Sequence, residues 1–258
     1  MILLRWWITA ALCLAAFPGV SWAQPDRDVL YQTSTLGALM IGIYDGPVTF
    51  GQLRQHGDFG LGTFNGLNGE MIALDGKFYQ ITADGIAHEV KDSTCTPFAA
   101  VTFFDRDHTA PIEGERSFTQ LTEHLGGLLP TENVFYAIRI DGTFSYVKTR
   151  SVPKQERPYP KLVDVIANQP TFEWRDVKGT LVGFRCPDYV RGVNVAGYHF
   201  HFIDDARTKG GHVLECRLRG GTVTTDLTRE LLLALPESED FDRAALENDD
   251  EQATHHPE

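Results

Sequence analysis

The chain has 258 residues, 42% of them hydrophobic, which is enough for one large domain or two small ones with a substantial core. Asp and Glu number 35 against 23 Lys and Arg, which gives a formal net charge of −12. This acidic balance lacks the basic footprint that nucleic-acid binding requires, so we expect no nucleic-acid partner.

Residues 1–23 are typical of a secretory signal peptide. An uncharged apolar run over 6–17 follows Arg5, and the small residues Ser21 and Ala23 form the pattern of a cleavage site. The run is shorter than the roughly 20 apolar residues of a membrane-spanning helix. We therefore expect an exported protein, periplasmic or extracellular, that has no membrane contact once this segment is removed.

Runs that mix aromatic and β-branched residues dominate the rest of the sequence and predict short strands. The clearest runs cover 77–82, 97–104, 134–150, 179–185 and 198–203. Inside the run 134–150, the pair Asp141-Gly142 predicts a tight hairpin turn between two strands.

Helical patterns are fewer, and they cover 34–42, 49–55, 117–129 and 161–169. The second opens with a threonine cap, Ser117 is the expected N-cap of the third, and Pro170 limits the fourth. Strands outnumber helices without a regular βαβ alternation, which favours the α+β class.

Three histidines fall within fourteen residues of the segment GYHFHFIDDARTKGGHVLEC. His199 and His201 point to the same side of a strand. If a hairpin is centred between positions 206 and 207, His201 lies opposite His212, with Cβ atoms about 4.5–5.5 Å apart. Three imidazoles would then converge as the ligands of one Zn²⁺ ion, with a fourth position open as in catalytic sites. Imidazole also suits Fe, Ni and Cu.

The alternative is a solvated strand on which the histidines fall by chance. Phe200 and Phe202 would bury the opposite face of this strand. Three uncompensated imidazoles on the remaining face would make a poor core, which favours the metal site.

The proline-rich segment 151–162 is the expected seam between two parts of the chain. A mixed part, 24–150, would precede it, and a β-rich metal-binding part, 151–236, would begin there. The acidic segment 237–258 is typical of a solvated tail.

Three cysteines remain after removal of the leader, at positions Cys95, Cys186 and Cys216. Their spacing fits no paired-cysteine zinc motif, so we interpret them as buried small residues with at most one disulfide.

Two charged residues have both a structural and a functional interpretation. Glu70, in the β-like run GEMIAL, is either a strand-end surface group or a buried acid aimed at a site. Arg150 either forms a salt bridge or clamps a substrate carboxylate, for which the guanidinium fork is suited. The residues alone leave both choices open.

Four strings together resemble alpha-acetolactate decarboxylases: GALMIGIYDG, GDFGLGTFNGLNGEMIALDGKFYQI, VKTRSVPKQERPYP and GYHFHFIDDARTKGGHVL. The likeness runs from about Leu30 to Pro236 in the order and spacing of that family. It implies a mixed sheet followed by a β-barrel-like sheet. It also implies a zinc-dependent lyase, a monomer or homodimer, that converts 2-acetolactate to acetoin and CO2.

The resemblance assigns roles to single residues. The zinc ligands would be His199, His201 and His212. The acid of the GEM motif falls on Glu70, the arginine before SVPKQ falls on Arg150, and the threonine of the GLGT turn, a substrate-binding position, falls on Thr63.

A glutamate from the tail of the family would also return to the zinc, and here it falls on Glu258, with Glu251 as its competitor. Zinc would chelate the ketone and hydroxyl oxygens, Arg150 would orient the carboxylate, and Glu70 or Glu258 would deliver the proton. Neither thiamine diphosphate nor pyridoxal is required, because the ketone of the substrate accepts the electrons.

Two other functions compete with this hypothesis. A cupin-like metal oxygenase is disfavoured because its third histidine would lie much further along the chain than His212. An exported zinc-binding protein without catalysis would explain the histidines but not the glutamate and arginine.

Overall fold

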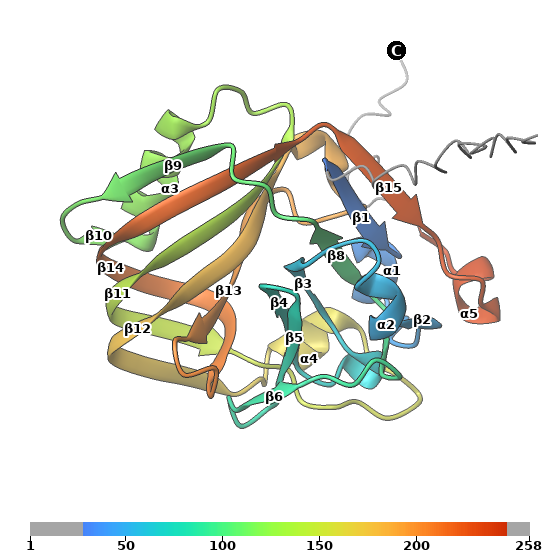
Figure 1. Ribbon diagram of the computed structural model, residues 1–258. Helices are drawn as coiled ribbons and strands as arrows, with labels where there is room; N and C mark the ends of the chain where they lie inside the picture. The colour runs from blue at the N-terminus through green and yellow to red at the C-terminus, as the bar shows by residue number, and fades with distance from the viewer. Residues whose placement is uncertain (1–27, 247–258) are drawn as a thin grey trace, which may run out of the picture.

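The computed structural model describes residues 28–246, which form two large β-sheets with short helices around them (Figure 1). The expected signal peptide, 1–23, lies outside the described residues, as do Glu251 and Glu258. Strands outnumber helices, and the predicted α+β class is confirmed.

A seven-stranded sheet occupies the right of Figure 1, with the order β15-β1-β8-β3-β4-β5-β6. All neighbours are antiparallel except β1 and β15, which run parallel. The strands are β1 (Val29–Thr33), β3 (Phe59–Thr63), β4 (Glu70–Leu74), β5 (Lys77–Ile81), β6 (Ala87–Glu89), β8 (Ala99–Thr102) and β15 (Glu230–Ala234).

A six-stranded sheet occupies the left of the view, with the order β10-β14-β11-β12-β13, and β9 also pairs with β14. Its strands are β9 (His108–Ile112), β10 (Arg116–Ser117), β11 (Phe135–Arg150), β12 (Thr171–Cys186), β13 (Gly197–Asp204) and β14 (Gly210–Thr228). Because β14 pairs with β13 as well as with β11, the pairings run from β14 through β11, β12 and β13 and back to β14. A separate pair joins β2 (Val48–Thr49) to β7 (Cys95–Thr96).

The predicted turn at Asp141-Gly142 was wrong, because both residues lie in the middle of the continuous strand β11. Gly142 is flanked by Gly179 of β12 and Gly221 of β14. A Cβ atom on Gly142 would lie 2.7 Å from the carbonyl oxygen of Gly220. The glycine therefore permits a close approach of neighbouring backbones, and strand pairing on both sides overrides the local turn preference.

The expected division at residue 150 does not coincide with the two sheets. Strands β9, β10 and β11 precede the proline-rich segment 151–162, yet they belong to the same sheet as β12, β13 and β14. Strand β15 returns to the first sheet, beside β1. The chain therefore changes sheet between β8 and β9 and again after β14.

The four predicted helices are confirmed as α1 (Leu36–Met40), α2 (Phe50–Leu53), α3 (Phe118–Leu128) and α4 (Leu162–Ile166). Ser117 caps α3 through a reciprocal capping box, and Thr49 caps α2 in the same way. The 3₁₀ turns η1 (Asn65–Leu67) and η2 (Asp188–Val190) lie in connections.

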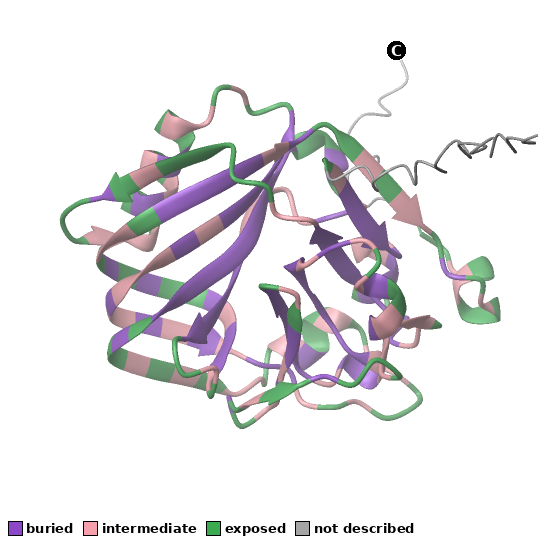
Figure 2. Cartoon of the chain, in the orientation of Figure 1, coloured by how far each residue is buried: buried purple, intermediate pink, exposed green. Residues whose placement is uncertain are grey.

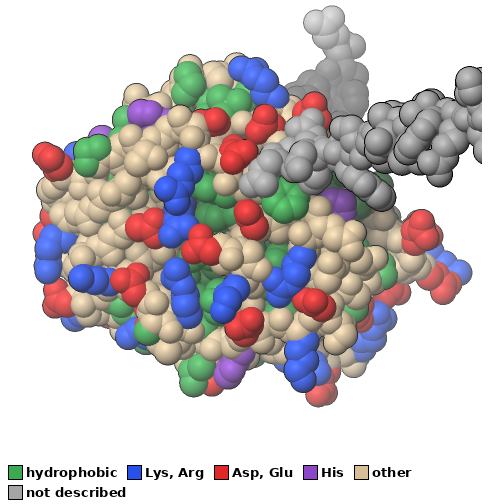
Figure 3. Space-filling model, in the orientation of Figure 1, with side chains coloured by type: hydrophobic (Ala, Val, Ile, Leu, Met, Phe, Trp, Pro, Cys, Tyr) green, Lys and Arg blue, Asp and Glu red, His purple; other side chains and the backbone are tan. Residues whose placement is uncertain are grey.

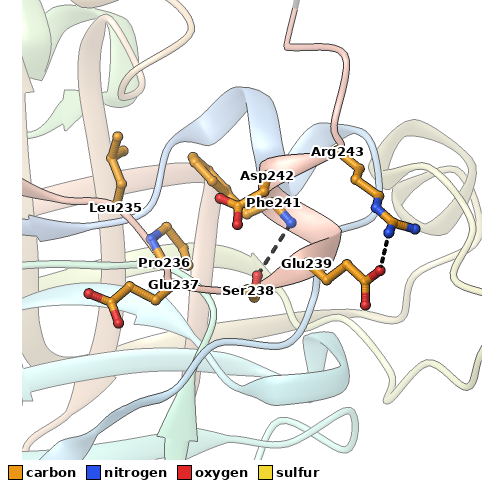
Figure 4. Close-up of a pocket in the computed structure, with 8 residues that line it drawn as sticks. All are labelled: Leu235, Pro236, Glu237, Ser238, Glu239, Phe241, Asp242 and Arg243. Atoms are coloured by element: carbon orange, nitrogen blue, oxygen red, sulfur yellow. Dashed lines mark hydrogen bonds and ion pairs between the residues drawn. The ribbon is translucent and has the colours of Figure 1, made fainter.

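A further helix, α5 (Glu239–Asp242), lies in the segment expected to be a solvated tail. At the N-terminus of this helix, Figure 4 shows the Ser238 side chain accepting a hydrogen bond from the backbone N–H of Phe241. Arg157 joins this helix to the body of the protein, because its guanidinium contacts both Asp45 and Asp240.

Apolar side chains fill the space between the two sheets, and Figure 2 shows the inner strands β8, β3 and β4 of the seven-stranded sheet as buried. Residues such as Phe59 and Ile72 meet Phe135, Val182 and Ile203 of the other sheet. The three cysteines of the described chain are all free, with Cys186 and Cys216 buried and Cys95 partly buried.

Candidate active site

The predicted histidine hairpin is confirmed. Strands β13 and β14 pair with His201 directly opposite His212, and His199 lies two positions before His201. One nitrogen from each ring lies within 4.8 Å of the others. Nε2 of His199 and Nδ1 of His212 are 3.0 Å apart. The three imidazoles therefore converge on one point.

A backbone carbonyl fixes the orientation of the central imidazole. Nδ1 of His201 lies 2.8 Å from the carbonyl oxygen of Met71 in β4, which can only accept, so this nitrogen carries the proton. The lone pair of His201 is then on Nε2. This buried Nε2, like Nδ1 of His199, has no hydrogen-bond partner within the described chain.

Burial keeps all three imidazoles neutral. It lowers the pKa of His199 to about 4, with a smaller contribution from Arg150. Burial also lowers the pKa values of His201 and His212 well below their ordinary value. The second-largest cause for both residues is the electrostatic effect of His199. Neutral imidazole is the form that binds metals.

These residues fit a metal ion. Two nitrogen ligands at 2.0–2.1 Å from one tetrahedral zinc lie about 3.3 Å apart, close to the separation of the His199 and His212 nitrogens. The carbonyl that orients His201 is the kind of partner that metal-bound histidines usually have. The unpaired Nε2 of His201 would gain a partner when a metal binds.

Glu70 begins β4 and is a buried acid rather than a surface group. Its Oε2 lies 3.6 Å from Nε2 of His201. Burial raises the pKa of Glu70 to about 7, against the opposing effects of Arg150 and a hydrogen bond from the backbone N–H of Val152. Near neutral pH, a large fraction of this carboxyl therefore carries a proton.

Arg150 ends β11 and lies opposite His212 in the strand register. Burial lowers its pKa, and the nearby Glu70 opposes that shift. Its buried Nε has no hydrogen-bond partner among residues 28–246. A partly buried guanidinium whose buried Nε is a free donor is suited to bind a carboxylate of a ligand.

Thr63 ends β3 and pairs with Glu70 in the sheet. Its hydroxyl donates a hydrogen bond of 2.7 Å to the carbonyl oxygen of Gly69, the residue before Glu70. Thr63 therefore steadies the start of β4, and its side chain also lines the cavity described next.

All six of these side chains line one cavity of about 100 Å³. The other side chains that line this cavity are apolar: Leu36, Leu39, Leu67, Phe98, Val152, Leu162, Ile166 and Val195. Nothing in the sequence separated these residues from ordinary core positions, because apolar side chains at helical or strand spacing have the same pattern in both settings.

Comparison with known proteins agrees with this geometry. The family model described as alpha-acetolactate decarboxylase matches residues 30–248. The chain belongs to the alpha-acetolactate decarboxylase family. It is thus an enzyme of the carboxy-lyase class, and the resemblance noted in the sequence is confirmed.

Relatives in this family are similar over most of their length. The alpha-acetolactate decarboxylase of Methanosarcina mazei is 53% identical over 219 residues, which cover 85% of this chain and 76% of that protein. The one from Methylococcus capsulatus is 48% identical over 233 residues, which cover 90% of this chain and 89% of that protein.

Solved structures share the fold. The crystal structure of alpha-acetolactate decarboxylase from Bacillus subtilis strain 168 matches with a TM-score of 0.85 at 43% identity, covering 87% of this chain and 96% of that chain. A Staphylococcus aureus protein of unknown function, similar to alpha-acetolactate decarboxylase, matches with a TM-score of 0.82 at 35% identity, covering 85% and 94%.

The structure thus brings together Thr63, Glu70, Arg150 and the three histidines that the sequence singled out in this family member. Glu258 and its competitor Glu251 lie outside the described residues. The tail carboxylate therefore stays a prediction.

Proposed function

We propose that this chain decarboxylates 2-acetolactate to acetoin and CO2, with one Zn²⁺ ion held by His199, His201 and His212. The observation that carries the proposal is one small cavity that contains three converging neutral imidazoles, the buried carboxyl of Glu70 and a partly buried arginine. The names of the relatives support the same substrate.

The substrate carries a carboxylate, a hydroxyl and a ketone on adjacent carbons. Loss of CO2 leaves an electron pair that the ketone must accept. Bound zinc would supply a Lewis acid for the charge that develops on the ketone oxygen.

Arg150 would hold the carboxylate that leaves, through its unpaired Nε donor. Holding this group in one orientation also directs the bond that breaks toward the ketone. Glu70, which lines the same cavity 3.6 Å from Nε2 of His201, would deliver the proton to the carbon that loses CO2. Glu258 remains the competing donor, with Glu251 as the alternative tail residue.

Export and assembly are also part of the proposal. The leader pattern of residues 1–23 supports a periplasmic or extracellular protein. No helix within residues 28–246 is long and apolar enough to span a bilayer.

On the face drawn in Figure 3, acidic and basic side chains are interspersed. We propose a monomer or homodimer that acts on a small molecule, and a barrel-like second sheet, supported by the returning strand pairings.

The decisive experiment incubates purified protein with racemic 2-acetolactate under nitrogen and measures acetoin and CO2. A strong chelator should abolish both products, and added zinc should restore them. His201→Gln should lose bound zinc, whereas the exposed His88→Gln in β6 should retain it. Turnover that survives complete metal removal would refute the zinc proposal. Tight zinc binding without turnover would favour a binding protein, and a requirement for O2 would favour an oxygenase.

A further inference from the structure

Two helices of about one turn each, α1 and α4, contribute side chains to the lining of the cavity and contact each other. Helix α4 contributes Leu162 and Ile166, whose i, i+4 spacing places them on one face. Between them in sequence, Val163 is 57% exposed. Helix α4 therefore presents one side to the cavity and the other to solvent.

The polar part of the cavity lining consists of Thr63, Glu70, Arg150 and the three histidines, whose nitrogens lie close together. A ligand held by these groups must turn its carbon substituents toward the apolar side. In 2-acetolactate these substituents are two methyl groups, one of them on the carbon that loses CO2. The space that the apolar side chains leave thus limits the alkyl group at that carbon.

The apolar lining combines fully buried core residues with the partly buried side chains of α4. Leu67, Phe98 and Val152 are at most 3% exposed and pack in one cluster with the fully buried Tyr44. Helix α4 has five residues, no side-chain hydrogen bond at its N-cap Lys161, and cavity-facing residues that are only partly buried. Val165 of α4 belongs to the same cluster, and Leu162 and Ile166 pack against it, so this helix holds the two cavity-lining side chains in place.

We infer that Leu162 and Ile166 of α4 are specificity-determining residues that set the largest alkyl group the substrate can carry on its reacting carbon. The inference rests on the proposed function, because it assumes that the polar side of the cavity holds the 2-hydroxy-3-keto acid.

The test compares 2-acetolactate with its homologue that has an ethyl group in place of the methyl group on carbon 2. The measured quantity is the ratio of kcat/KM for the ethyl substrate to kcat/KM for the methyl substrate, with the zinc-loaded, full-length protein. Leu162→Ala and Ile166→Ala should each raise this ratio about tenfold, since one methylene group in a pocket is worth at least that factor. Leu162→Phe should lower it.

Val163→Ala is the matched control, because it also shortens an apolar side chain of α4, but on the exposed face of the helix. Its ratio should equal that of the parent protein. Ratios that stay within twofold of the parent for both Leu162→Ala and Ile166→Ala would overturn the inference. An equal rise in Val163→Ala would also overturn it, since that result indicates general loosening of the helix.

A binding measurement separates this inference from the proposed function. Analogues of both substrates with the ketone reduced to an alcohol cannot lose CO2, because they have no electron acceptor. Calorimetry should show the same shift in the ratio of their Kd values in the alanine variants. A shift in binding without turnover of either substrate by the parent would refute the proposed function and support the role of α4. Unshifted binding in variants that retain turnover would refute the role of α4 and support the proposed function.

Discussion

The carboxylate oxygen Oε2 of Glu70 lies 3.6 Å from Nε2 of His201, across the boundary between the two sheets. Glu70 begins β4 of the seven-stranded sheet, and His201 lies in β13 of the six-stranded sheet. The carbonyl of Met71, the residue after Glu70, accepts a hydrogen bond from Nδ1 of the same imidazole. One strand thus positions both the candidate acid and the candidate ligand.

Glu70→Gln keeps the shape of this side chain and removes its acidic proton. We expect turnover of 2-acetolactate to fall about 100- to 10,000-fold, the usual contribution of a general acid. Zinc content, measured by elemental analysis, should stay near one ion per chain because the histidines are unchanged. Glu89→Gln, on exposed β6, should have parent activity. Unchanged turnover in Glu70→Gln would remove this residue from the chemistry.

Arg150→Lys retains the positive charge but loses the planar fork. A hydrogen bond to a charged group is worth about 1.5–3 kcal/mol, so kcat/KM for 2-acetolactate should fall roughly 10- to 100-fold. The same replacement at Arg219, which is exposed beside Asp176, should leave kcat/KM unchanged. Parent-like kinetics in Arg150→Lys would show that a point charge is sufficient there.

The local part of the site could be predicted from the sequence. The alternation of side chains in a strand places His199 and His201 on one side, and the polar segment between the two strands fixes the partner of His201 as His212. Helix caps at Thr49 and Ser117 are equally local, and both are present.

The long-range part could not be predicted. The close approach of three backbones at Gly142 depends on strands far apart in the sequence, so the local Asp-Gly pattern gave the wrong answer. Likewise, Leu162 and Ile166 look like core residues until α4 is placed across the cavity. Burial, which raises the pKa of Glu70, also depends on both sheets.

Gly142→Ala tests the close approach in the middle of β11. The added Cβ would lie 2.7 Å from the Gly220 carbonyl oxygen, in a sheet that is paired on both sides. Overpacking of this kind costs about 1–3 kcal/mol, so the free energy of unfolding in urea should fall by that amount. Gly127→Ala in α3, where the added Cβ would meet no described atom within 4 Å beyond its chain neighbours and its own helix backbone, should instead gain about 0.5–1 kcal/mol. Equal stabilities of the two variants would contradict the packing argument.

Asp226 in β14 makes stability depend on pH. This side chain is fully buried, and its Oδ1 has no hydrogen-bond partner within residues 28–246. Burial raises its pKa to about 7, with the carboxylates of Asp107, Asp28 and Asp105 adding to the shift and a hydrogen bond from the backbone of Asp105 opposing it. The folded chain therefore binds this proton more tightly than the unfolded chain does. It follows that the free energy of unfolding decreases as pH rises from about 4 to above 7.

Asp226→Asn removes this dependence, and its amide oxygen can still accept the hydrogen bond from the Asp105 backbone. The variant should be more stable than the parent protein, by an amount that grows by about 2–3 kcal/mol between pH 5 and pH 8. Urea unfolding of both proteins at the two pH values measures this difference, and other titrating groups cancel because both proteins share them. Asp176→Asn, whose side chain is 72% exposed, should show no such growth. A constant difference between Asp226→Asn and the parent would mean that Asp226 stays ionised in the folded protein, with a cation or water compensating its charge.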